Sequence, residues 1–186
     1  MTTWKNNNTL ESRRLVEEVL GSTEEPEKVV ARDEEHLKWI IKERMLYQGP
    51  NCDLNDIDVS HVTYMDGLFK GSKFNGDISQ WDVSNVIDMS YMFKDSEFNG
   101  DISGWDVSRV ADMNSMFENS KFNGDLSKWD VRKVEDMSLM FRWSHFDGDI
   151  SNWDVSGVRN IYDMFSDSPL EGREPSWYPE CYKMNS

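Results

Sequence analysis

The chain has 186 residues, of which 30% are charged, and carries a formal net charge of −15 at pH 7. Nucleic acids and anionic membrane surfaces are themselves negative, so this acidity argues against both as direct partners. No apolar run approaches the roughly 20 residues that a membrane-spanning helix needs, and the opening residues MTTWKNNNTLESRRL lack the apolar core of a signal peptide. These features predict a cytoplasmic protein.

Two helices are predicted in the first 49 residues. One covers residues 9–22 and ends before Pro26. The other covers residues 31–49 and ends at Gly49. Its apolar face consists of Leu37, Ile40, Ile41 and Met45. The repeats that follow would otherwise leave one apolar face uncovered, so we expect residues 1–49 to form an N-terminal helical segment whose second helix caps them.

From residue 50 onward the chain repeats one 24-residue pattern, written most clearly as FNGDISQWDVSNVIDMSYMFKDSE from Phe74. The same step separates the tryptophans of four copies, which are Trp81, Trp105, Trp129 and Trp153. A more divergent first copy occupies residues 50–73, with Ile57 at the tryptophan position. Five copies therefore span residues 50–169, and residues 170–186 are expected to close the far end. Such a period is typical of stacked repeats that fold as one cooperative domain.

Each copy contains the elements of a leucine-rich repeat. Ile78, Trp81 and Val83 follow an L-x-x-L-x-L pattern, which predicts a short strand after an Asn-Gly-Asp turn. One helical face is predicted downstream, made of Val86, Met89, Met92 and Phe93. We therefore predict an α/β repeat solenoid of the leucine-rich-repeat type, with five 24-residue rungs, a parallel strand ladder and a helical N-terminal cap.

The shared motif, FNGDISxWDVSxVxDMSxMF, resembles the repeats of the BspA-like leucine-rich repeat family, specifically those of the domain of unknown function 285 type. The resemblance covers residues 51–165. It implies a leucine-rich-repeat fold and a general role in binding, and it brings no catalytic residues with it. Surface-exposed members of the family carry export signals or lipoprotein cysteines, which this sequence does not show, so a surface adhesin ranks behind the functions considered below.

The repeated tryptophans and methionines are predicted to fill the core, because their positions in the pattern point inward. Stacking on a glycan is the alternative for the tryptophans, and metal or promiscuous binding is the alternative for the methionines. The histidines fall at unrelated positions of the repeat, and Cys52 and Cys181 lie at opposite ends of the chain. We therefore expect a non-enzymatic protein with no cofactor and no metal.

Two columns of aspartates recur with the same period. The first aspartate column precedes the predicted strands and comprises Asp53, Asp77, Asp101, Asp125 and Asp149. Adjacent exposed carboxylates about 5 Å apart repel each other by about 1–3 kcal/mol, so a compensating interaction is expected. One explanation is that each carboxylate accepts backbone N–H groups of its turn; the alternative is a ladder of bound calcium ions.

The second aspartate column comprises Asp58, Asp82, Asp106, Asp130 and Asp154. It would project from the strands, and its members are either framework or partner-facing. The fourth repeat departs from this acidic pattern at Lys128, Arg132 and the adjacent Lys133, which indicates either a partner contact or a local salt bridge. The predicted partner-binding residues are therefore Asp58, Asp82, Asp106, Lys128, Asp130, Arg132, Lys133 and Asp154.

Two functions follow from this surface. The first is a monomeric scaffold that binds a partner protein through the sheet face. The second is an acidic decoy that mimics nucleic acid and occupies a DNA- or RNA-handling enzyme, as phage-encoded inhibitors do. The decoy is favoured by the acidity of residues 50–169, where 22 Asp and Glu against 10 Lys and Arg give −12.

Overall fold

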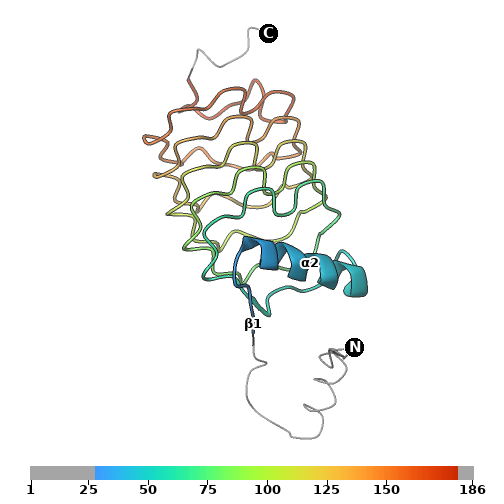
Figure 1. Ribbon diagram of the computed structural model, residues 1–186. Helices are drawn as coiled ribbons and strands as arrows, with labels where there is room; N and C mark the ends of the chain where they lie inside the picture. Colours follow the sequence, from blue (N-terminus) through green and yellow to red (C-terminus); the bar gives the residue numbers. More distant parts are fainter. Residues whose placement is uncertain (1–27, 180–186) are drawn as a thin grey trace, which may run out of the picture.

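The computed structural model describes residues 28–179, so the helix predicted over residues 9–22 lies outside the described residues. Strand β1 (Val29–Val30) and helix α2 (Glu34–Gln48) precede the repeats, and strand β2 (Ile57–Asp58) lies in the first repeat. The two strands pair in parallel, with Val29 opposite Ile57 and Val30 opposite Asp58. After β2 the chain winds in irregular coils that stack on one another away from α2 (Figure 1).

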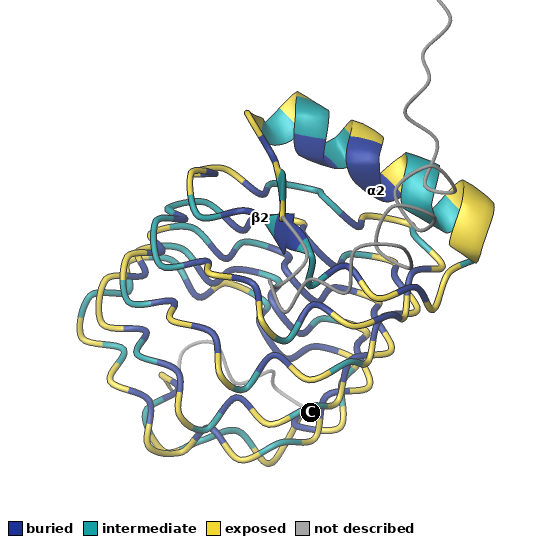
Figure 2. Cartoon of the chain, turned by 90° about the horizontal axis from the view of Figure 1, so that it is seen from below, coloured by how far each residue is buried: buried dark blue, intermediate teal, exposed yellow. Residues whose placement is uncertain are grey.

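Helix α2 confirms the predicted second helix, over a slightly shorter range. The carboxylate of Asp33 accepts the N–H of His36 at 2.8 Å and so caps the first turn. Gly49, with φ of 86°, ends the helix and donates its N–H to the Met45 carbonyl. Leu37, Ile40 and Ile41 are buried, and this side of α2 faces the coils (Figure 2).

The predicted leucine-rich-repeat solenoid, with five rungs, a parallel strand ladder and a helical cap, is wrong. The described residues contain one helix and one two-stranded parallel sheet. In place of a strand ladder, single bridges join the repeats, at Asp53–Asp77, Tyr64–Asp88, Asp88–Asp112, Asp112–Asp136 and Asp136–Asn160. The helix therefore covers no ladder of strands.

The predicted repeat strand does not form because several of its backbone N–H groups bond to nearby residues of the same repeat. Ser79 and Ser84 donate theirs to the side chains of Asp77 and Asp82, at 2.9 and 3.1 Å. Trp81 donates its N–H to the Ile78 carbonyl at 3.2 Å. A strand in a ladder must instead offer alternate N–H groups to its neighbour. In this segment those N–H groups already form hydrogen bonds within turns.

The predicted repeat helix is also absent, because the segment turns left-handed at every fourth residue. Tyr91 has φ of 58° and Asp95 has φ of 57°, values that a right-handed helix does not contain. The N–H groups of Met89, Tyr91 and Phe93 each reach a carbonyl of the next repeat at 2.9 Å. This segment therefore makes the main-chain contacts between repeats that the strand was expected to make.

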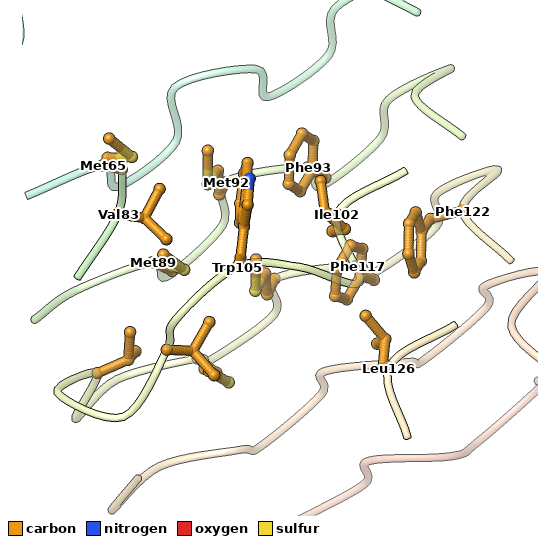
Figure 3. Close-up of a cluster of buried hydrophobic side chains, with 14 of the residues drawn as sticks. Met65, Val83, Met89, Met92, Phe93, Ile102, Trp105, Phe117, Phe122 and Leu126 are labelled. Atoms are coloured by element: carbon orange, nitrogen blue, oxygen red, sulfur yellow. The ribbon is translucent and has the colours of Figure 1, made fainter. Parts of the chain in front are cut away.

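The core confirms the predicted burial of the aromatic and methionine columns. The four repeat tryptophans are each 4% exposed, so the alternative of an exposed glycan-stacking ladder is wrong. Equivalent rings lie one above another, with 6.5 Å between the centroids of Trp81 and Trp105 and 5.6 Å between those of Phe93 and Phe117. Figure 3 shows Trp105 within this cluster beside Met92, Phe93 and Phe117.

Each buried indole also satisfies a backbone carbonyl of the preceding repeat. Trp81 donates its Nε1–H to the Leu54 carbonyl at 2.9 Å, and Trp105 repeats the bond to Ile78 at 3.2 Å. Trp177, which lies one further 24-residue step after Trp153, stacks on it and donates its Nε1–H to the Ile150 carbonyl at 2.9 Å. Because a buried carbonyl without a partner is costly, tryptophan is favoured at this position over other large apolar residues.

Candidate functional site

The first aspartate column has the turn-stabilising role that was predicted for it. In each repeat the Asp Oδ1 accepts the backbone N–H of the residue two positions later, at 2.8–2.9 Å. Hydrogen bonds from Ser103 lower the pKa of Asp101, and those from Ser151 lower the pKa of Asp149. These bonds favour the charged carboxylate and offset the repulsion within the column.

The second aspartate column is held in the same way. Its Oδ1 atoms accept the N–H two residues later at 2.9–3.3 Å, from Ser60, Ser84, Ser108, Arg132 and Ser156. The question left open by the sequence is therefore answered in part, because every member is framework. The second carboxylate oxygen keeps a fixed direction and is available to a partner where the side chain is exposed.

A third aspartate column was missed by the sequence analysis because it falls at the start of the predicted helix. Asp88, Asp112 and Asp136 accept the N–H two residues later at 2.8 Å, and Asn160 does so at 3.2 Å. The signal was present in the second repeat as a third Asp-x-Ser motif, after the two at Asp77 and Asp82. This column is more buried, and desolvation raises the pKa of Asp112.

The alternative of a calcium ladder finds no preformed site in residues 28–179, where no group of three or more His, Cys, Asp or Glu side chains is arranged to hold a metal ion. Each turn carboxylate has one oxygen already engaged by the backbone. Calcium sites in proteins use six to eight oxygen ligands, and the columns do not bring that many together.

The predicted partner-binding aspartates differ in exposure along the stack. Asp82, Asp106 and Asp154 are exposed, and Asp130 is half-buried. Asp58 lies in β2 opposite Val30 and is also half-buried. The coils therefore present this column most openly in the repeats beyond the first.

The three cations of the fourth repeat are not equivalent. Arg132 forms a two-pronged pair with Asp130, with Nε–Oδ1 at 2.8 Å and Nη2–Oδ2 at 2.6 Å, so the local salt bridge considered from the sequence exists. The hydrogen bond from Arg132 is the largest cause that lowers the pKa of Asp130, to about 2. Lys128 and Lys133 are exposed, and neither makes an ion pair with residues 28–179.

Lys128 stands beside the first aspartate column and Lys133 beside the second. The pKa of Asp125 is lowered first by hydrogen bonds from Ser127 and also by the charge of Lys128. The pKa of Asp106 is lowered first by hydrogen bonds from Ser108 and also by the charge of Lys133. The fourth repeat thus places one positive charge next to each of the first and second aspartate columns. We name this region, with Asp106, Asp125, Lys128 and Lys133, the lysine patch.

Exposed aromatic residues on the left-handed segment were also missed. Tyr91 is 39% exposed and lies under Lys70 and Lys94, whose Nζ atoms are 5.2 and 5.7 Å from the ring centroid. Trp143 is 47% exposed and contacts the Arg142 guanidinium at 4.0 Å. These contacts lie within the chain and fix the rings. Because Tyr91 and Trp143 occur in different repeats and at different positions of the left-handed segment, the surface of this segment also differs from repeat to repeat.

The arrangement defines a repeat protein whose surface varies on a constant framework. The family described as "Mycoplasma protein of unknown function, DUF285" matches residues 43–144 and 96–171. The chain therefore belongs to this family. Comparison with curated proteins and with solved structures gave no match. Within residues 28–179 no helix is long and apolar enough to cross a membrane.

Proposed function

We propose that this protein is a non-enzymatic scaffold that acts in the cytoplasm and binds a partner protein through the face formed by the first and second aspartate columns. The observation that carries the proposal is the lysine patch, in which two exposed lysines that make no ion pair with residues 28–179 interrupt columns of fixed carboxylates. A kinship of the repeats with BspA-like repeats is part of the same proposal and rests on the shared motif.

Preorganisation supports binding at this face. Every carboxylate of the two columns is held by the N–H two residues later, so little side-chain freedom remains to be lost when a partner docks. The cost of ordering a long side chain at an interface is about 0.5–1.5 kcal/mol, and a fixed side chain avoids much of it. Neighbouring repeats are joined by stacked buried rings, which keeps the spacing between carboxylates constant.

The lysine patch supplies the information that a uniform acidic surface lacks. A basic partner segment could slide along identical repeats, because each repeat offers the same pair of aspartates. Lys128 and Lys133 stop this sliding in the fourth repeat, where the partner must supply acidic or neutral groups. Charge patterns of this kind fix register and exclude wrong partners more than they add affinity.

The test compares three immobilised proteins in affinity capture, with captured proteins identified by mass spectrometry. In the variant Lys128→Gln/Lys133→Asn, the fourth repeat carries the residues of the second, Gln80 and Asn85. The matched control is Arg132→Ser, which restores the Asp-x-Ser turn found in the other repeats and removes a cation that is already paired. We expect a specific partner to be lost with the double variant and retained with the control.

The nucleic-acid-mimicking decoy remains the second candidate, since hydrogen bonds lower the pKa values of several carboxylates of the first and second aspartate columns and keep them charged; these are Asp77, Asp101, Asp106 and Asp154. It predicts the opposite result. Removing the two lysines would preserve or strengthen capture of a DNA- or RNA-handling enzyme, and double-stranded DNA would compete for it. If the double variant and the wild type capture the same proteins equally and DNA has no effect, both proposals fail.

A further inference from the structure

Helix α2 has a second apolar stripe that faces away from the coils. Trp39, Leu46 and Tyr47 are 58%, 71% and 74% exposed. Glu35, Trp39, Lys42 and Leu46 are all exposed and recur at steps of four, three and four residues, which is the spacing of a helix–helix seam. The inward face is occupied by Leu37, Ile40 and Ile41, so the outward stripe is not needed for the packing of the helix on the core.

The order of residues along this stripe, together with the adjacent half-buried Glu43, is self-complementary. Consider two copies of α2 that lie antiparallel, related by a two-fold axis that passes between Lys42 and Glu43. Trp39 of each copy then faces the partner's Leu46, and Lys42 faces the partner's Glu43. Because the axis repeats every contact, the interface contains two apolar contacts and two pairs of opposite charge. Neither Lys42 nor Glu43 makes an ion pair with residues 28–179.

We infer that the outward stripe of α2 docks against a second copy of this chain in that antiparallel arrangement. The occupant is identified by charge complementarity, since a single copy carries both members of each charge pair in the order that the two-fold axis requires. The monomer expected from the sequence is therefore replaced by an equilibrium between monomer and dimer. The dimer would leave the lysine patch, which lies in the fourth repeat, outside the interface.

The interface is small, and this sets the concentration range of the test. A helix of 15 residues is about 22 Å long at a rise of about 1.5 Å per residue. One such seam buries less than the roughly 800 Å² per partner of a standard stable interface. We therefore expect association to be visible above about 10 µM rather than at nanomolar concentrations.

A charge-swap series on the full chain tests the arrangement by sedimentation equilibrium between about 5 and 500 µM. Lys42→Glu and Glu43→Lys each place like charges opposite one another twice, and we expect dimer association to weaken at least roughly tenfold. The double variant Lys42→Glu/Glu43→Lys restores opposite charges across the axis and should restore the dimer. Lys121→Glu, the same charge change at an exposed site in the third repeat, should leave association unchanged.

Thermal melts of each variant separate loss of dimer from loss of fold, and Trp39→Ala provides a second disruption that does not change charge. The inference is overturned if the wild type stays monomeric to 500 µM, or if the single variants associate as the wild type does. It is also overturned if the folded double variant fails to recover association. A wild type that becomes dimeric only after residues 1–27 are removed would show that the chain's own N-terminal segment covers the stripe instead.

Discussion

Substituting Ser115 by glycine should stabilise the protein, although Ser115 is fully buried in the middle of the stack. Ser115 has φ of 53°, in the left-handed region, and is 0% exposed. Its Oγ has no hydrogen-bond partner among the described residues. The equivalent residue of the first repeat is Gly67, with φ of 60°, so the fold already accepts glycine at this position.

The expected gain in the free energy of unfolding is the sum of two costs that the substitution removes, less one cost that it adds. A non-glycine residue in the left-handed region costs about 1 kcal/mol, and an unsatisfied buried hydroxyl costs at least about 1 kcal/mol. The greater chain entropy of glycine in the unfolded state takes back about 0.5 kcal/mol. The net gain of about 1.5 kcal/mol should raise Tm by about 3–6 °C, since a chain of this size shifts by about 2–4 °C per kcal/mol.

Two further variants separate these contributions in thermal and denaturant melts. Ser115→Ala removes the hydroxyl and keeps the strained backbone, so it should raise Tm by about 2–4 °C. Ser103→Gly introduces glycine at a repeat serine that is not in the left-handed region and should lower Tm by about 1–4 °C. A Ser115→Gly protein less stable than Ser115→Ala would refute the reasoning, because it would mean that the left-handed conformation costs less than the roughly 0.5 kcal/mol of chain entropy that glycine adds.

Three other outcomes follow from the same geometry. Trp129→Phe removes the indole N–H that bonds the Ile102 carbonyl at 3.2 Å and should destabilise the fold by about 1–3 kcal/mol. Trp177→Phe, at the half-buried end of the stack, should destabilise it less. Urea melts compare the two variants. Asp112→Asn should raise Tm at pH 7, because burial raises the pKa of this carboxyl and so penalises its charged form; the gain should vanish as the pH falls below about 4. Hydrogen bonds lower the pKa values of aspartates such as Asp77 and Asp154 in the folded protein, so the unfolded chain binds protons at these carboxylates at a higher pH than the folded protein does. Thermal melts should therefore show stability falling as the pH drops from about 4 to 2.

The long-range order of the molecule could be predicted from the sequence, because a strict period fixes which residues become neighbours. A step of 24 residues places Phe93 next to Phe117 and Trp81 next to Trp105 whatever the chain does between them. The C-terminal end of α2 could also be predicted, since Gly49 ends the helix by a local mechanism. Buried columns and one helix therefore followed from spacing and from end signals.

The local path of each repeat could not be read in the same way. The spacing of Met89, Met92 and Phe93 suits a helical face, but a left-handed residue every fourth position also turns these side chains inward. That conformation is unusual for tyrosine, leucine or tryptophan, so Tyr91, Leu139 and Trp143 concealed it. The more divergent first copy contained the signal, because Gly67 and Gly71 stand at the two left-handed positions.

At the candidate site, the sequence identified the charged columns and the turn bonds of the first one, but not which cation of the fourth repeat is paired. Arg132 and Asp130 are two residues apart, a spacing that points side chains in different directions on a helix and leaves them about 6.5 Å apart on one face of a strand. The Asx turn at Asp130 folds the chain back so that the guanidinium and the carboxylate meet. The paired Arg132 and the unpaired Lys128 and Lys133 could therefore be distinguished only with the turn geometry.

The acidity of the repeats has a structural cause that precedes any partner. Each of the second to fifth repeats makes three turns in which an Asp or Asn side chain accepts an N–H, as at Asp77, Asp82 and Asp88 in the second repeat. Replacing these carboxylates by side chains that cannot accept the N–H would disrupt turns as well as remove charge, so a loss of binding in such variants would say nothing about recognition. The lysines stand outside this framework. Their removal changes the surface without touching a turn, and for this reason the choice between scaffold and decoy is best decided at Lys128 and Lys133.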